Sequence, residues 1–139
     1  MKLRHMKLYI GLFIATAFAL SLSSCGPQVI NVSETEDFHM ILSADSASAG
    51  EITFHVTNNA TDMLHEFVVV KSDLAEDQLP LDSDGNVDED KIDHIDEVED
   101  INPGESKDLK VKLEPGHYVF MCNLPNHYNQ GMHASFTVK

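Results

Sequence analysis

The chain has 139 residues, two cysteines, eight histidines and a formal net charge of −14, with 23 acidic against nine basic residues. This length favours one domain, and a charge this negative argues against nucleic-acid binding, which needs a basic face. Loss of residues 1–24 would remove Lys2, Arg4 and Lys7 but no acidic residue, leaving six basic and 23 acidic residues and a charge of −17. Such a charge favours protein partners that carry a basic face.

Residues 1–24 have the pattern of a bacterial lipoprotein signal peptide. A positively charged start is followed by an apolar stretch over residues 8–20 and by Leu22-Ser23-Ser24 before Cys25. The pattern predicts cleavage before Cys25 and a lipid on that cysteine, with residues 25–31 as a tether to a domain over residues 32–139. The protein would then be exported to the cell envelope and anchored to the membrane, facing the periplasm or the cell exterior. The alternative is a retained membrane helix, for which the apolar stretch is short.

Most of the remaining chain alternates apolar and polar residues with the two-residue period of β-strands. The alternation is clearest at Leu109, Val111 and Leu113, and turn signals such as Pro115-Gly116 interrupt it. The expected strands cover residues 38–42, 51–57, 63–70, 107–113, 118–122 and 132–138, and residues 26–36 are either a tether or a first edge strand. Several short strands separated by turn signals predict an all-β sandwich.

An acidic segment, residues 73–104, interrupts this pattern. Its first 28 residues contain thirteen acidic residues and one basic residue, Lys91. We interpret it as a solvated loop insertion, anchored by a few apolar residues and with room for one short helix. A calcium loop is the alternative, because Asp82, Asp84, Asn86 and Asp88 alternate like calcium ligands. Gly85 and Asp93, however, do not fit the glycine and glutamate positions of that motif.

A cluster of potential metal ligands lies near the C-terminus. Cys122, His127 and Met132 are arranged as Cys-x4-His-x4-Met. A thiolate, an imidazole and a thioether suit copper far better than magnesium or calcium, which prefer oxygen. Cys122 ends one expected strand and Met132 begins the next, so the three side chains would lie on a loop between two strands. A lone thiol in an exported protein is unusual unless a metal holds it.

A second histidine would complete a copper site of two histidines, a cysteine and a weak axial methionine. His65 is the best candidate, because it begins the apolar stretch 65–70 and shares a face with Phe67 and Val69. A histidine without a ligand role would be a polar group in an apolar strand. The other histidines lie in the signal peptide, on outward faces, in the acidic segment or opposite the cysteine: His5, His39, His55, His94, His117 and His133.

These motifs resemble those of the cupredoxins, the family of plastocyanin, azurin, rusticyanin and auracyanin. The resemblance covers residues 32–139 and includes the Asn58-Asn59 turn, His65, the Gly-x-Tyr-x-Phe-x-Cys motif over residues 116–122, His127 and Met132. It implies a Greek-key β-sandwich with one type 1 copper ion, held by His65, Cys122, His127 and Met132, that passes single electrons between redox proteins.

The chain departs from the family pattern next to the first histidine. Many cupredoxins have an asparagine there that connects the two ligand loops by hydrogen bonds, whereas this chain has Glu66. Glu66 is therefore a candidate for tuning the copper from outside the ligand set. The acidic segment is also absent from the small plastocyanins.

Two other functions use related chemistry. A copper-handling protein, for resistance or for delivery to an oxidase, would need the same ligand atoms as an electron carrier. The closed ligand set, without a methionine-rich tract, favours the carrier. An enzyme of the multicopper type would need more histidines and a longer chain, so we expect that the protein is not an enzyme.

Overall fold

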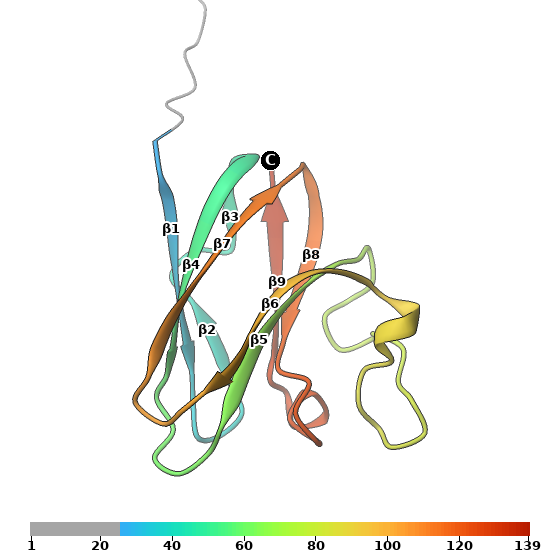
Figure 1. The fold of residues 1–139 in the computed structure, drawn as a ribbon. Coiled ribbons are helices and arrows are strands. Elements are labelled where there is room, and N and C mark those ends of the chain that lie inside the picture. Colours follow the sequence, from blue (N-terminus) through green and yellow to red (C-terminus); the bar gives the residue numbers. More distant parts are fainter. Residues whose placement is uncertain (1–25) are drawn as a thin grey trace, which may run out of the picture.

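Alternating apolar residues build two β-sheets that pack face to face, as the computed structural model of the protein shows for residues 26–139 (Figure 1). The predicted all-β sandwich is confirmed. The predicted signal peptide over residues 1–24 and the predicted lipid attachment at Cys25 lie outside the described residues. Within residues 26–139, no helix has the length and apolar character needed to cross a membrane.

The first sheet has the strand order β2-β1-β4-β7 and the second has the order β3-β9-β8-β5-β6. The strands of the first sheet are β1 (Gln28–Glu34), β2 (Met40–Leu42), β4 (Gly50–Asn58) and β7 (Ser106–Leu113). Those of the second are β3 (Ser46–Ala47), β5 (His65–Lys71), β6 (Asp93–Ile101), β8 (Gly116–Met121) and β9 (His133–Val138). Two 3-10 turns, η1 (Glu89–Lys91) and η2 (Tyr128–Gln130), are the only helical elements among the described residues.

The main hydrophobic core lies between the two sheets. Phe54 of β4 packs against Phe67, Phe120 and Phe136 of the opposite sheet, with ring centroids 4.9–5.7 Å apart. Cys122 and Met132 belong to the same buried cluster. Two of the four candidate ligands are therefore part of the close-packed core itself.

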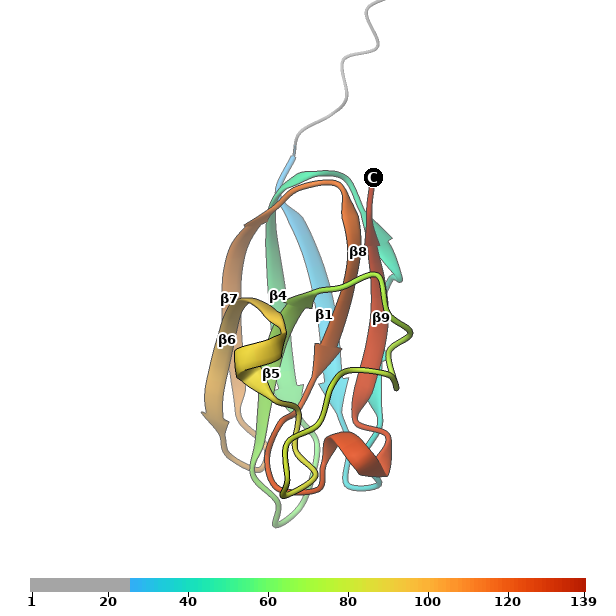
Figure 2. The same ribbon diagram turned by 90° about the vertical axis from the view of Figure 1, so that its right-hand side faces the viewer.

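A second hydrophobic cluster covers the outer face of β5 and β8. Val68, Val70, Val119 and Met121 point away from the main core and pack against residues that include Leu79 and Val87. Leu79 and Val87 belong to residues 72–92, which we call the connecting segment and which crosses the outside of this sheet (Figure 2). Residues 67–70 are apolar on both faces of β5 because both faces of this strand are covered.

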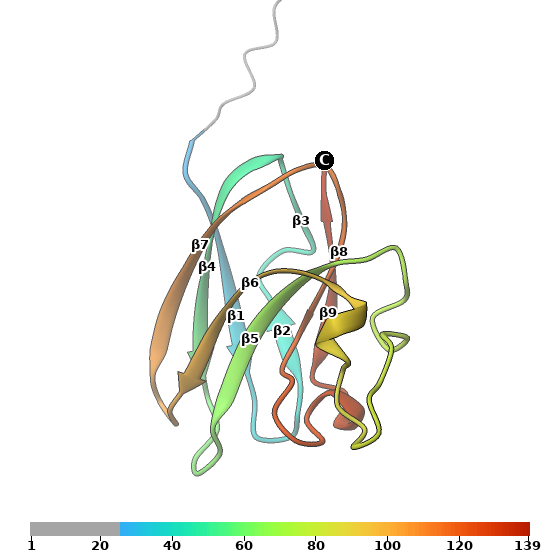
Figure 3. The ribbon, with the colours of Figure 1, turned by 45° about the vertical axis from the view of Figure 1, so that its right-hand side comes forward.

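Two boundaries predicted from the sequence are wrong. The expected tether, residues 25–31, overlaps β1, which begins at Gln28 and is an interior strand between β2 and β4. The acidic segment is not a loop throughout, because Asp93–Ile101 forms the edge strand β6 (Figure 3). Two irregularities in the pairing of β5 with β6 add residues to β6. Its inward apolar residues Ile95, Val98 and Ile101 are therefore three positions apart, a spacing that hides the strand period.

Candidate metal centre

The candidate ligands meet at one end of the sandwich. His65 is the first residue of β5, and Cys122 follows directly on the last residue of β8. These strands are antiparallel neighbours, with Val68 opposite Met121, so the start of β5 lies beside the end of β8. His127 and Met132 follow on the donor loop, which we define as residues 122–132, before β9 begins at His133. The chain enters the sandwich at the opposite end, where β1 begins (Figure 1).

Three of the four predicted ligands converge. The ligand atoms of His65, Cys122 and His127 all lie within 4.8 Å of one another. The Nδ1 atoms of His65 and His127 are 3.3 Å apart, and Nδ1 of His127 is 3.2 Å from Sγ of Cys122. His65 and Cys122 are fully buried, whereas His127 is only partly buried.

The spacing of these atoms fits one small metal ion. Donors held trigonally at about 2.0 Å for nitrogen and about 2.3 Å for sulfur are separated by roughly 3.5–3.8 Å. The observed separations of 3.3 and 3.2 Å are within about half an ångström of that range. Two imidazoles and one thiolate in this arrangement are the equatorial ligand set of an electron-transfer copper site.

Met132, the fourth predicted ligand, is bonded through its backbone to two members of the cluster. Its side chain is fully buried in the main core. Its backbone is hydrogen-bonded to both other candidate ligands of the donor loop. The Met132 carbonyl accepts from the Cys122 N–H at 3.1 Å, and the Met132 N–H donates to the His127 carbonyl at 3.2 Å. The structure places Met132 at the site, and its role as the axial ligand stays a prediction.

Burial sets the protonation of the three converging groups. It raises the pKa of the Cys122 thiol to about 12, partly offset by backbone hydrogen bonds from Leu124 and Glu66. It lowers the pKa of His127 and also that of His65, on which the neighbouring His127 acts in the same direction. Both imidazoles are therefore neutral at pH 7, with lone pairs available for a metal, and metal binding must displace the thiol proton.

Glu66 connects the two parts of the site. Its Oε1 accepts a hydrogen bond of 2.8 Å from the N–H of Asn123, and its own N–H donates to Sγ of Cys122 at 3.4 Å. Burial raises the pKa of this carboxyl, and the hydrogen bond from Asn123 opposes the shift. Glu66 therefore connects β5 to the donor loop. In many cupredoxins an asparagine at this position makes the connection between the two ligand loops.

The remaining described histidines lie away from the three converging atoms, as predicted. His55 pairs with Asp108 on the exposed face of the first sheet, and His117 bonds to the Ser72 carbonyl. His133 faces Glu76 and the ring of Tyr128. His39 is paired with Asp37 and His94 with Glu97.

The sequence interpretation missed one unusual residue, Glu34. This side chain is fully buried at the end of β1, and among the described residues neither carboxyl oxygen has a hydrogen-bond partner. Burial raises its pKa to about 9, and the Glu66 carboxylate adds to the shift. A signal existed, because Glu34 continues the inward alternation of Ile30 and Val32.

The sandwich and its buried cysteine–histidine cluster define the class of protein, a copper-binding β-sandwich with a single metal centre. Residues 28–139 match the profile of a family described as copper binding proteins, plastocyanin/azurin family. The chain belongs to this family, which confirms the predicted resemblance and the predicted copper cofactor. No curated protein sequence matches the chain.

Solved structures with similar folds include two auracyanins and an azurin. A dithionite-reduced auracyanin from Roseiflexus castenholzii is 24% identical, with a TM-score of 0.63, and the match covers 82% of this chain and 99% of that one. Auracyanin A, a "blue" copper protein from Chloroflexus aurantiacus, is 22% identical with a TM-score of 0.59, covering 82% and 100%. An azurin from Methylomonas sp. strain J is 18% identical with a TM-score of 0.56, covering 82% and 99%. At these identities the likeness concerns the fold.

Cys122→Ser should abolish the intense thiolate-to-copper absorption of the copper-loaded protein, because the thiolate is the source of that transition. The sandwich should survive, since serine fills nearly the same volume. Visible absorption and circular dichroism measure the two effects. His55→Ala, an exposed histidine outside the cluster, is the control and should keep the band. A band of undiminished intensity in Cys122→Ser would exclude this cysteine as the ligand.

Glu66→Asn should raise the reduction potential at pH 7. A carboxylate beside the site favours Cu(II) over Cu(I), and its removal corresponds to roughly 50–100 mV, or about 1–2 kcal/mol for one electron. Because burial raises the pKa of Glu66, the wild-type potential should rise as the pH falls through that pKa, and the difference from the variant should shrink. Voltammetry tests this, with Glu51→Gln at the opposite end of the sandwich as control. Equal potentials at every pH would contradict it.

Glu34→Gln should make the metal-free protein less sensitive to alkaline pH. The folded-state pKa of about 9 is above the ordinary value of 4.5, so the folded state retains a proton that the unfolded state loses. Stability therefore falls as the pH rises from about 5 to 9, by at most about 1.4 kcal/mol per unit from this group.

Urea unfolding at pH 6 and pH 8 measures the effect. Between these values, the wild type should lose roughly 2–3 kcal/mol more than Glu34→Gln. Glu36→Gln is the control, because the pKa of Glu36 is lowered by hydrogen bonds from Thr61 and this exposed group stays charged throughout. Parallel pH profiles for the wild type and Glu34→Gln would contradict the assignment.

Proposed function

We propose that the protein is an electron carrier in which His65, Cys122, His127 and Met132 hold one type 1 copper ion. The observation that supports it most directly is the convergence of one ring nitrogen from each of two histidines and one cysteine sulfur, all within 4.8 Å of one another, at one end of the sandwich. Copper bound there supplies a one-electron Cu(II)/Cu(I) couple. Met132 would supply a thioether that tunes the potential of the bound copper, and we expect no catalytic activity.

The surrounding structure supports ligands that would stay in place in both oxidation states of the copper. His65 and Cys122 are fixed to the core by β5 and β8, and the Met132 backbone bonds to Cys122 and His127. A site with fixed ligands rearranges little when the charge of the ion changes, which favours fast electron transfer. The burial of the thiol and of His65 also opposes release of the ion, so it supports a carrier over a copper-handling protein.

Electrons enter and leave through His127. It is the only member of the converging group of described residues that is partly exposed. Phe38 packs edge-on against its ring at a centroid distance of 5.1 Å, and Leu124 lies partly buried beside the same core. A partner that covers this end of the sandwich would approach the metal through one imidazole ring.

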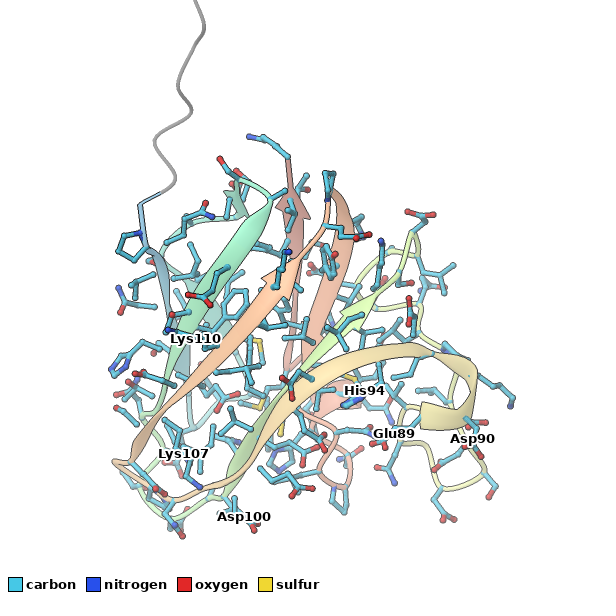
Figure 4. The ribbon with its side chains drawn as sticks, turned by 45° about the horizontal axis from the view of Figure 1, so that its top comes forward. Glu89, Asp90, His94, Asp100, Lys107 and Lys110 are labelled. Atoms are coloured by element: carbon cyan, nitrogen blue, oxygen red, sulfur yellow. The ribbon has the colours of Figure 1, made fainter. Side chains whose placement is uncertain are left out.

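The charge around this end favours a partner with a basic face. Asp82, Asp84, Glu89 and Asp90 of the connecting segment are exposed, and the segment bonds to the donor loop at Asn123 and Asn126. Figure 4 shows Glu89 and Asp90 at η1, across the sandwich from Lys107 and Lys110 on β7. The approach beside His127 is therefore acidic, and steering should weaken with salt.

A lipid on Cys25 would tether this domain to the membrane of the cell envelope. The support is the signal-peptide pattern of residues 1–24 and the start of β1 at Gln28, three residues after Cys25. Because β1 begins at the end of the sandwich away from the candidate ligands (Figure 1), the metal site would face away from the membrane. A partner outside the membrane could then reach it.

Voltammetry of residues 26–139 with copper should show a reversible one-electron wave. The reduced protein should keep at least nine-tenths of its copper over an hour with a moderate Cu(I) chelator, because fixed, buried ligands exchange slowly. The measurements are the wave itself and the absorbance of the chelator complex. Rapid loss of copper on reduction, with no reversible wave, would refute the carrier and favour copper delivery.

A further inference from the structure

The connecting segment is a folded element with its own anchors. Leu79 and Val87 are 4% and 2% exposed and pack on the outer face of β5 and β8. Leu81 and Val87 form an isolated antiparallel bridge, and the Asp88 N–H donates to the Pro80 carbonyl at 2.8 Å. The segment is therefore fixed to the same pair of strands that positions His65 and Cys122.

Several hydrogen bonds connect this segment to the donor loop. The Tyr128 hydroxyl accepts from the Leu79 N–H at 3.0 Å and donates to the Glu76 carbonyl at 2.8 Å. The Asn126 N–H donates to Oδ1 of Asn86 at 3.3 Å, and the Asn129 side chain donates to the Gly85 carbonyl. Tyr128 is itself buried, so the loop between His127 and Met132 is held from outside the sandwich.

The densest connection is at Asn123, the residue directly after Cys122. Its Oδ1 accepts from the Val87 N–H at 2.8 Å, and its Nδ2 donates to the Val87 carbonyl at 3.1 Å and to Oε1 of Glu89 at 2.9 Å. Its N–H donates to Glu66, whose own N–H reaches Sγ of Cys122. The Asn123 side chain thus ties the Cys122–Asn123 peptide to the connecting segment. The Asn123 backbone N–H ties the same peptide to β5.

We propose that the connecting segment braces the donor loop and that Asn123 is the positioning residue through which it holds the Cys122 thiol. The proposed function requires copper at this site but no brace, and only the copper measurements below depend on it. In this proposal the connecting segment has a structural role at the metal site in addition to its negative charge.

The chain offers a matched control at the other end of the sandwich. The Gln28 carboxamide bonds to both backbone groups of one residue, as that of Asn123 does with Val87. It accepts from the Ser48 N–H at 2.8 Å and donates to the Ser48 carbonyl at 2.9 Å. Gln28→Ala therefore removes a similar two-point contact far from the donor loop. A general loosening of the protein would affect both variants alike.

The first measurement uses the metal-free protein. Alkylation of the Cys122 thiol requires local opening, because the side chain is fully buried. Asn123→Ala removes three hydrogen bonds, each worth a factor of roughly two to five, so alkylation should be about 10- to 100-fold faster. Gln28→Ala should alkylate at the wild-type rate. Equal rates for Asn123→Ala and the wild type, or equal acceleration in both variants, would overturn the brace.

A second pair of substitutions keeps the test informative if Asn123→Ala fails to fold. Asn123→Asp removes the donors to Val87 and Glu89 and brings a second carboxylate next to Glu89, so it should also speed alkylation. Adding Glu89→Gln lets the new carboxamide at position 89 donate to the new carboxylate at position 123, the reverse of the wild-type hydrogen bond. The double variant should therefore recover part of the wild-type rate. No recovery in the double variant would count against the contact with Glu89 as part of the brace.

The copper-loaded protein gives the readout that a purely structural role would not change. Asn123→Ala should alter the thiolate-to-copper absorption and the copper hyperfine splitting in electron paramagnetic resonance, whereas Gln28→Ala should leave both unchanged. Unaltered spectra in Asn123→Ala would overturn the link to the thiol. If the wild type shows no thiolate-to-copper band, the proposed function fails, and the alkylation measurements still decide the brace.

Discussion

The antiparallel pairing of β5 with β8 is the constraint on which the metal centre depends. Val68 lies opposite Met121, and this register brings the first residue of β5 beside the residue that follows β8. A shift by one residue would exchange the side chains that face the main core with those that face the second cluster. Packing on both faces excludes this shift, since the main core fixes Phe67 and Phe120 and the second cluster fixes Val68 and Val119.

The same burial that fixes the ligands creates their electrostatic environment. Removal from water raises the pKa of Cys122 and lowers the pKa of both histidines. The metal site is thus assembled from neutral groups, a thiol and two imidazoles, and a bound cation supplies the charge that turns the thiol into a thiolate. Glu34 and Glu66 carry raised pKa values close to this site, so its electrostatics depend on more than the ligands.

The connecting segment changes how a small sandwich supports a metal loop. A loop anchored only at its two strand ends would depend on its own turns for rigidity. Here Tyr128 reaches the backbone at Leu79 and Glu76, and Asn123 reaches Val87. In our proposal the connecting segment therefore has two roles, a charged surface and a support for the donor loop, and mutations can change one without the other.

The sequence by itself determined the strand class of the fold and the residues that converge. The two-residue alternation predicted the sandwich, and the Cys-x4-His-x4-Met spacing with His65 predicted the ligand set, because these patterns are local and follow from strand geometry and metal preference.

Only the tertiary structure decided that β1 begins at Gln28 and that residues 93–101 form a strand. The bulges in the pairing of β5 with β6 disguise the period of that strand, and bulges depend on a partner distant in the chain. The partners of Glu66 and Asn123 and the isolation of Glu34 likewise arise between segments far apart in sequence, where no local pattern records which side chains will meet.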